Sequence, residues 1–186
     1  MPRAGLDGAV VVERAGELLD QRPGDSLSLA VVADSLGVRA PSLYKHVDGL
    51  PGLHRGLVLL AKGALSDALR DAVVGRSGDD AVTGLADAYR RWALAHPGQY
   101  PLTVRAPLEG DADDLAVSER ATSVVYTALG GYGLDGDDAV DATRFLRAAL
   151  HGFVSLETSG AFALPVDLER SWRRAVQHVV AALAAW

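Results

Sequence analysis

Apolar residues recur at helical spacing along almost the whole chain, and this pattern constrains the fold more than any other feature of the sequence. The first predicted helix shows it clearly, with one apolar face made of Val11, Ala15, Leu18 and Leu19. Breaks containing glycine or proline separate such stretches, and no segment alternates apolar and polar residues as a half-buried strand does. The sequence therefore predicts an all-α fold of about nine helices.

The expected helices are bounded by residues that start or stop helices, such as the candidate N-cap Ser28 and the C-terminal Gly37. Their predicted ranges are 6–21, 29–36, 41–47, 50–74, 79–96, 99–105, 115–132, 140–156 and 168–185.

Composition excludes several classes of protein. The 186 residues include no cysteine, which rules out disulfides and thiolate metal sites. The N-terminus has acidic residues from Asp7 onward and does not read as a signal peptide. No stretch reaches the roughly 20 apolar residues that a membrane helix needs. We therefore expect a cytoplasmic protein with no membrane partner. Its net charge of −6 means that any DNA contact must come from a local surface.

The stretch from Ser28 to Val47 has the layout of a helix-turn-helix, in which two short helices are joined by a turn containing glycine. The second helix of such a unit can lie in the major groove of DNA. The apolar residues expected to pack the two helices together are Val32, Ala33, Leu36, Val38 and Leu43.

The outward side of this unit carries side chains suited to DNA. Arg39 can bind guanine or a phosphate, Ser42 is a short donor, and Ala40 can contact a thymine methyl group. Tyr44, Lys45 and His46 suit the sugar-phosphate backbone. With the cap and the proline of the first turn, the candidate DNA-binding residues are Ser28, Arg39, Ala40, Pro41, Ser42, Tyr44, Lys45 and His46.

Structural roles are open for two of these residues. Tyr44 could be a buried core residue, and His46 could cap the C-terminus of its helix, where the dipole favours a cation.

The segment "SLAVVADSLGVRAPSLYKHVDGLPGL" resembles the helix-turn-helix of the tetracycline-repressor (TetR) family of transcriptional regulators. The matching elements are Val32-Ala33, Gly37-Val38, Ser42-Leu43-Tyr44 and His46-Val47. "RFLRAALHGFVSLETSGAF", at 144–162, also resembles a C-terminal domain with a recurring His-Gly-Phe segment, the WHG type, found in a subgroup of these regulators.

The resemblance implies a DNA-binding domain over 1–50 and a ligand-binding and dimerisation domain over 51–186. It further implies a repressor that binds double-stranded operator DNA and responds to a small-molecule effector. The long helix predicted at 50–74 would link the two domains and transmit the response.

Two later helices carry wide apolar stripes that suggest a homodimer. Two such helices from each subunit would form a four-helix bundle about a twofold axis, and the operator should then be a near-palindrome. The stripes comprise Val140, Thr143, Leu146, Ala149, Leu150, Phe153 and Val154, and then Leu168, Trp172, Ala175, Val176, Val179, Val180 and Leu183.

Aromatic residues with polar tips are the candidates for an effector pocket, because a buried Trp or Tyr needs a partner for its N–H or O–H. Each could instead be an ordinary core residue, and His151 could be a histidine on the helix surface. The candidate ligand-binding residues are Tyr89, Trp92, Tyr100, Tyr126, Phe145 and His151.

Two other functions are open to this sequence. Residues 1–50 hold five basic and seven acidic side chains, a net charge of −2, and lack the lysine that the family often has near the start of the fourth helix. His54 and Arg55 could replace it, or the protein could be a helical ligand-binding or protein-interaction module that no longer binds DNA. Acid clusters at 111–114 and 135–138 raise the possibility of a metal-dependent enzyme, but they fit helix capping better. With no catalytic motif, we expect no enzyme, metal or cofactor.

Overall fold

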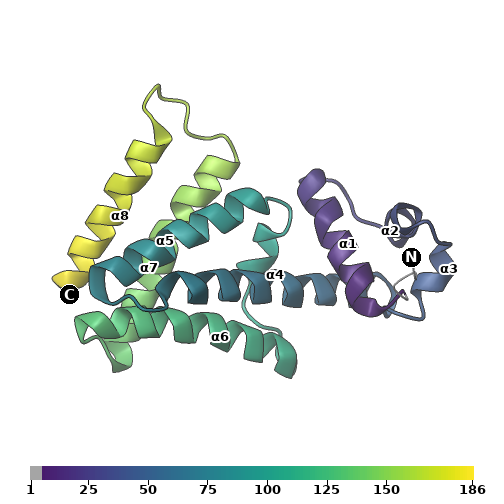
Figure 1. The fold of residues 1–186 in the computed structure, drawn as a ribbon, viewed down its shortest axis with the longest axis horizontal. Helices are drawn as coiled ribbons and strands as arrows, with labels where there is room; N and C mark the ends of the chain where they lie inside the picture. Colours follow the sequence, from purple (N-terminus) through teal and green to yellow (C-terminus); the bar gives the residue numbers. More distant parts are fainter. Residues whose placement is uncertain (1–5) are drawn as a thin grey trace. The chain divides into compact units, whose positions relative to one another are not determined.

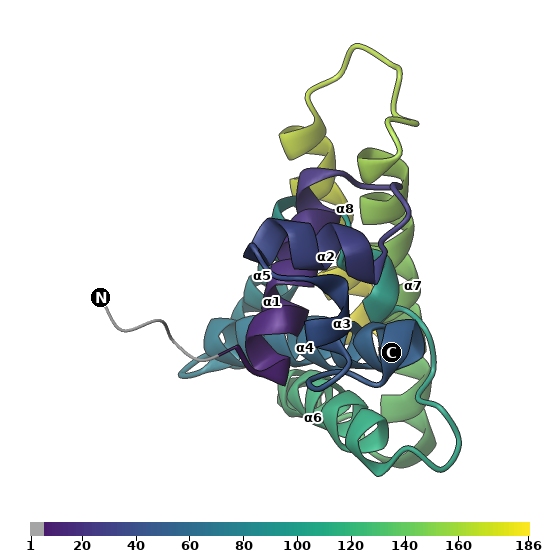
Figure 2. The same cartoon turned by 90° about the vertical axis from the view of Figure 1, so that its right-hand side faces the viewer.

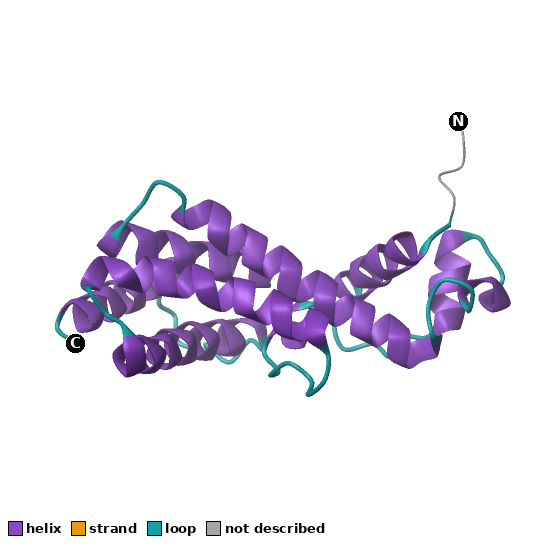
Figure 3. Cartoon of the chain, turned by 90° about the horizontal axis from the view of Figure 1, so that it is seen from below, coloured by secondary structure: helices purple, strands orange, loops and turns teal. Residues whose placement is uncertain are grey.

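The computed structural model describes residues 6–186, and within them every regular element is helical (Figure 3). Eight α-helices and two short 3-10 helices are present in this range, which confirms the predicted all-α class. The elements are α1 (Gly8–Gln21), α2 (Leu29–Leu36), α3 (Ala40–Leu43), α4 (Gly49–Val73), α5 (Gly78–Ala95), η1 (Tyr100–Thr103), α6 (Ala112–Leu129), η2 (Gly130–Tyr132), α7 (Gly136–Thr158) and α8 (Leu168–Ala184).

The third helix is shorter than predicted. The sequence pattern placed its end near His46 and Val47, but α3 ends at Leu43 and a turn follows. The backbone tightens there, because both the N–H of His46 and the N–H of Val47 donate to the carbonyl of Leu43, at 2.8 and 3.0 Å. This turn directs Val47 into the core, where it is 9% exposed. The bond from His46 to Leu43 spans three residues, as in a 3-10 turn, and marks where the regular α-helix ends.

The chain divides into two compact units. The first contains residues up to Ala64 together with a later segment, 95–117, and the second contains 65–94 and 118–186. Helix α4 contributes its first part to one unit and its last part to the other. We call residues 95–117 the connecting segment; it belongs to the first unit, whereas the resemblance implied a C-terminal domain that runs unbroken over 51–186.

The core of the first unit is formed by α1, α2, α3 and the start of α4. Its fully buried members include Val11, Val32, Leu43 and Leu53. Leu102 of the connecting segment packs against the same cluster. The expected packing of the two short helices is confirmed, since Ala33 is buried and Leu36 and Val38 are partly buried there.

Asp20, near the end of α1, anchors the connecting segment within the first unit. Its Oδ1 accepts from the backbone N–H groups of Gly98 and Gln99 at 3.0 Å each, and its Oδ2 accepts from Gln99 Nε2 at 2.6 Å. The ring of His96 also contacts this carboxylate, with Nδ1 2.8 Å from Oδ2. At Gly98 the backbones approach so closely that a Cβ would lie 2.1 Å from the carbonyl oxygen of Leu19. Glycine is therefore required at this contact.

In the second unit α7 and α8 lie side by side and are joined by a loop at one end (Figure 1). Arg90 of α5 joins both helices, because its Nε and Nη2 donate to Glu157 at 2.8 Å each and its Nη1 donates to Glu169 at 2.6 Å. The guanidinium also lies 5.3 Å from the ring centroid of Trp172, whose Nε1 donates to Asp87 at 2.7 Å. This network fixes the packing of three helices around one buried indole.

Most of the apolar stripe of α8 is buried against other helices of the same chain. Trp172, Val176, Val179 and Leu183 are all buried. Leu168, Ala175 and Val180 of the same stripe are half-buried, so part of it stays accessible on the surface of the chain. Across residues 6–186, each helix is too short or too polar to cross a bilayer.

Candidate functional site

Helices α2 and α3 form the predicted helix-turn-helix, which Figure 2 brings to the front together with α1. Ser28 is the N-cap of α2, and its hydroxyl accepts from the N–H of Val31 at 3.3 Å. Gly37 ends the helix at φ +66°, a left-handed conformation that favours glycine. The N–H of Val38 then donates to the carbonyl of Ala33 at 3.0 Å. Ser28 thus has a structural role in positioning α2, whether or not it also contacts DNA.

Residues 39–46, which we call the recognition segment, present most of their side chains to solvent. Arg39, Pro41, Tyr44 and Lys45 are exposed, while Leu43 is fully buried and anchors the segment to the core. The remaining candidates, Ala40, Ser42 and His46, are half-buried. All seven candidate residues of the segment are therefore at least partly accessible.

The structure decides between the two interpretations of Tyr44. Its side chain is 64% exposed, so the alternative of a buried core tyrosine is wrong. His46 follows the end of α3 in the turn, and within the described residues its ring makes no hydrogen bond to that helix. An accessible phenol beside Lys45 is suited to the sugar-phosphate backbone.

Charge is distributed unevenly over the first unit. Its described residues include seven lysines and arginines, and four of these, Arg14, Arg55, Lys62 and Arg105, form ion pairs with carboxylates. Over the same residues Arg22, Arg39 and Lys45 have no carboxylate partner. Two of the three uncompensated cations thus lie in the recognition segment, which concentrates positive charge there in an acidic chain.

Arg55 was a candidate to replace the lysine missing near the start of α4, but carboxylates occupy it in this structure. Its Nε and Nη2 bond the two oxygens of Asp111 at 2.6 and 2.7 Å, and Nη2 also bonds Asp113 at 2.7 Å. The bond from Arg55 lowers the pKa of Asp111 to about 2, with a smaller contribution from the N–H of Asp114. The same carboxylates raise the pKa of Arg55.

A second ion pair on α4 is buried. Lys62 Nζ lies 2.6 Å from Oδ1 of Asp114, and both side chains are almost inaccessible. Oδ2 of Asp114 accepts from the N–H of Leu108 at 3.0 Å and from Arg105 at 2.8 Å. Burial alone would raise the pKa of Asp114, but the bonds from Lys62 and Leu108 and the charge of Arg105 hold it below its usual value.

The six predicted ligand-binding residues do not belong to a single unit. Tyr100 lies in the first unit, and the other five lie in the second. Tyr89, Trp92 and Tyr100 are buried, and His151 is half-buried. Phe145 is exposed and packs against Trp186, with ring centroids 5.7 Å apart. Phe145 is therefore neither an ordinary core residue nor part of an enclosed pocket within this chain.

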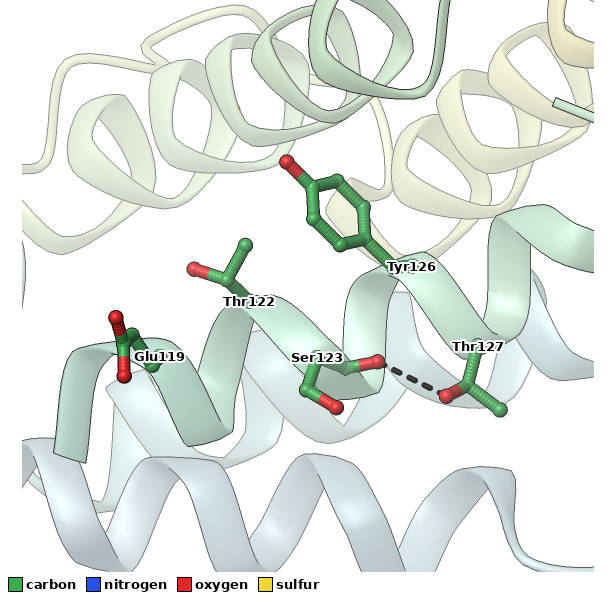
Figure 4. Close-up of a pocket in the computed structure, with 5 residues that line it drawn as sticks. All are labelled: Glu119, Thr122, Ser123, Tyr126 and Thr127. Atoms are coloured by element: carbon green, nitrogen blue, oxygen red, sulfur yellow. Dashed lines mark hydrogen bonds between the residues drawn. The ribbon is translucent and has the colours of Figure 1, made fainter. Parts of the chain in front are cut away.

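Tyr126 lines an open hollow of about 570 Å³ on α6. Figure 4 shows its ring on the same side of the helix as Thr122. The hydroxyls of Thr122 and Thr127 donate to the backbone one turn earlier, at Ser118 and Ser123. The complete lining is Glu119, Thr122, Ser123, Tyr126 and Thr127.

Tyr126 is the one lining residue that the sequence singled out, because only it is aromatic. The five residues recur at the spacing that places side chains on one helix face, but this spacing marks only a polar face and not a site. On α7 the hydroxyl of Thr143 is buried and has no hydrogen-bond partner among the described residues. No group of three or more potential metal ligands occurs in the described range.

Comparison with known proteins places these features in context. Residues 82–179 match the family model of the tetracyclin repressor-like, C-terminal domain. The chain is 40% identical over 158 residues to the uncharacterised HTH-type transcriptional regulator Rv0681 of Mycobacterium tuberculosis, a match that covers 84% of this chain and 72% of that protein. It is 34% identical over 172 residues to the uncharacterised HTH-type transcriptional regulator YobS of Bacillus subtilis, which covers 91% of this chain and 88% of the relative.

Solved structures show the same fold. The Streptomyces coelicolor TetR family protein ActR, in complex with actinorhodin, superposes with a TM-score of 0.69 over 98% of this chain and 97% of ActR. The two chains are 20% identical, so this likeness concerns the fold alone.

Proposed function

The chain belongs to the tetracycline-repressor (TetR) family of transcriptional regulators, and from this premise we propose that it represses transcription as a homodimer bound to a palindromic operator. A small-molecule effector releases it from DNA. On this proposal it acts in the cytoplasm, needs no cofactor and is not an enzyme.

The observation that carries the proposal is the uncompensated charge of the recognition segment. Most cations of the first unit are held by carboxylates, but Arg39 and Lys45 are exposed and have no carboxylate partner within the described residues. An exposed arginine can form paired hydrogen bonds with guanine, and an exposed lysine can neutralise a phosphate. Tyr44 lies between them along α3 and its turn, and its accessible hydroxyl can donate to the backbone.

Two observations support the proposed dimer: membership of the family, and apolar residues on the surface of the second unit. Phe145, Leu156 and Trp186 are exposed apolar side chains near α7 and α8. Gly152 of α7 has open space where a side chain would lie, which permits close approach of another helix. A twofold dimer places two recognition segments about 34–36 Å apart, or a multiple of this, on one face of the duplex.

The effector site is proposed in the second unit, at the hollow on α6 and the helices around it. Tyr126 offers an aromatic ring there, and the unpartnered hydroxyl of Thr143 is a group that a polar ligand could satisfy. ActR, which shares the fold, is described in complex with actinorhodin. The effector acts by favouring a state whose recognition segments no longer fit the operator, with α4 as the connection along the chain.

The proposal is tested by enriching duplexes from a random library with the full-length protein and measuring binding by band shift. Tyr44→Ala and Lys45→Ala should each weaken binding without changing helical content in circular dichroism. Arg22→Ala is the matched control, because Arg22 is also exposed and uncompensated but lies outside the recognition segment. If no duplex is enriched, the alternative of a helical ligand-binding or protein-interaction module without DNA binding is favoured instead.

A further inference from the structure

Arg55 lies on the surface of the first unit, yet two carboxylates occupy its guanidinium group. The side chain is 44% exposed, and its three bonds to Asp111 and Asp113 measure 2.6 to 2.7 Å. The contact with Asp111 is the paired arrangement in which two N–H groups meet two oxygens. The same fork of N–H groups fits two oxygens of a phosphate, so carboxylates and a DNA phosphate can compete for this side chain.

The position of Arg55 makes a DNA phosphate a suitable competitor. Helix α4 begins at Gly49, three residues after the recognition segment. Arg55 is six residues further, or about 9 Å along the helix axis. Leu53 and Leu57, on either side of it in sequence, are buried in the same core as Leu43. Arg55 and the recognition segment are therefore carried on one packed unit.

The competing carboxylates come from the connecting segment, which is distant in sequence. Asp111 precedes α6, and its Oδ1 also accepts from the N–H of Asp114 at 3.1 Å. Asp113 lies in the first turn of α6 and is 74% exposed. Helix capping accounts for Asp111 alone; the exposed carboxylate of Asp113 contributes a bond to Arg55 that capping does not require.

We infer that Arg55 is a phosphate-binding residue that Asp111 and Asp113 withhold from DNA, so that the connecting segment limits operator affinity. This inference rests on the proposed DNA-binding function. While the carboxylates hold Arg55, each subunit binds DNA through the recognition segment. When they release it, Arg55 adds one phosphate contact for each subunit.

The test compares operator binding of the wild-type protein, three variants and one control over a range of salt concentrations, with a duplex enriched by the wild-type protein as the probe. The variants are Asp111→Asn/Asp113→Asn, Arg55→Ala and the triple variant that combines them. Asparagine serves as well as aspartate at a helix N-terminus, so the start of α6 is preserved. Glu109→Gln removes an exposed charge from the same loop without touching Arg55 and controls for general electrostatics.

We expect Asp111→Asn/Asp113→Asn to bind more tightly and to show a salt dependence steeper by about 0.9 per contact, or about 1.8 for a dimer. Across a fourfold change in salt this corresponds to roughly a tenfold difference in affinity. Arg55→Ala in the wild-type background should change affinity less than about twofold, and the triple variant should lose the whole gain. Circular dichroism and thermal melting confirm that each variant is folded.

Three results would overturn the inference. Tighter binding that persists in the triple variant, or that Glu109→Gln reproduces, would assign the gain to charge alone. An unchanged affinity in Asp111→Asn/Asp113→Asn would show that Arg55 does not reach DNA. Loss of binding in Arg55→Ala alone would show that Arg55 already contacts DNA. If instead the wild-type protein enriches no duplex, the proposed function itself fails.

Discussion

Replacing Asp114 by alanine tests whether the buried ion pair with Lys62 holds the connecting segment in the first unit. The carboxylate of Asp114 is 0% exposed, and it accepts from Lys62, Arg105 and the N–H of Leu108. Removal of the carboxylate leaves Lys62 buried without this partner, and it leaves the N–H of Leu108 without its acceptor.

The expected loss in the free energy of unfolding is about 4–6 kcal/mol. Removing one partner of a buried ion pair costs about 3–5 kcal/mol, and the lost bond from the N–H of Leu108 costs about 1 kcal/mol. Arg105 is 28% exposed and can be rehydrated, so its contribution is small. In a chain of this size, 1 kcal/mol shifts the melting temperature by about 2–4 °C, which gives a decrease of roughly 8–24 °C.

Urea unfolding followed by circular dichroism measures this loss. Asp113→Ala is the matched control, because the neighbouring carboxylate is 74% exposed and its ion pair with Arg55 is screened by solvent, so its loss should change stability far less. A loss in Asp114→Ala within about 1 kcal/mol of that control would refute the reasoning, because the buried pair would then contribute no more than a surface pair.

Two further predictions concern the close contact at Gly98 and the acid sensitivity of Asp111. Gly98→Ala should destabilise the protein by roughly 1–3 kcal/mol, since the new Cβ meets the backbone of Leu19. Gly152→Ala is the control. Its Cβ would point into open space on α7, so this variant should not be destabilised when measured as a monomer at low concentration. The bond from Arg55 depresses the pKa of Asp111 from 3.8 to about 2 in the folded state, so its stabilising effect is complete above about pH 4 and is lost as the pH falls toward 2. The urea concentration at which half of the protein is unfolded should therefore fall less steeply between pH 5 and pH 2 in Asp111→Asn than in the wild type. An equal fall in both proteins would contradict this account.

Local signals account for the parts of the fold that the sequence predicted well. The cap at Ser28 and the left-handed Gly37 are set by residues within one turn of them. Apolar spacing identified the core of the first unit, including Val32 and Leu43. The exposure of Arg39 and Lys45 follows from the same spacing, because residues between the buried positions must face outward.

The role of the connecting segment could not be predicted, because its contacts join residues far apart in the chain. Asp20 and Gln99 are separated by 79 positions, and Arg55 and Asp113 by 58. Nothing in the local pattern of a lone aspartate distinguishes a long-range acceptor from a helix cap. For the same reason the sequence offered Arg55 as one possible replacement for the missing lysine but gave no sign that carboxylates occupy it.

The hollow on α6 was found only in part, for a different reason. Tyr126 was identified by its aromatic ring, but Glu119, Thr122, Ser123 and Thr127 carry no signal beyond a polar helix face. Polar faces are usual on helices that meet solvent, so spacing alone does not mark a site.

The dependence of operator affinity on salt concentration tests the central claim most directly, because its slope is proportional to the number of phosphates that the protein's cations neutralise. With Arg39 and Lys45 uncompensated on each of two subunits, the slope of log affinity against log salt should be no steeper than about −4. Lys45→Ala should make it shallower by roughly 2, one contact for each subunit, while Arg22→Ala leaves it unchanged. An identical slope in Lys45→Ala and the wild type would contradict the account, because DNA would then meet another surface of the protein.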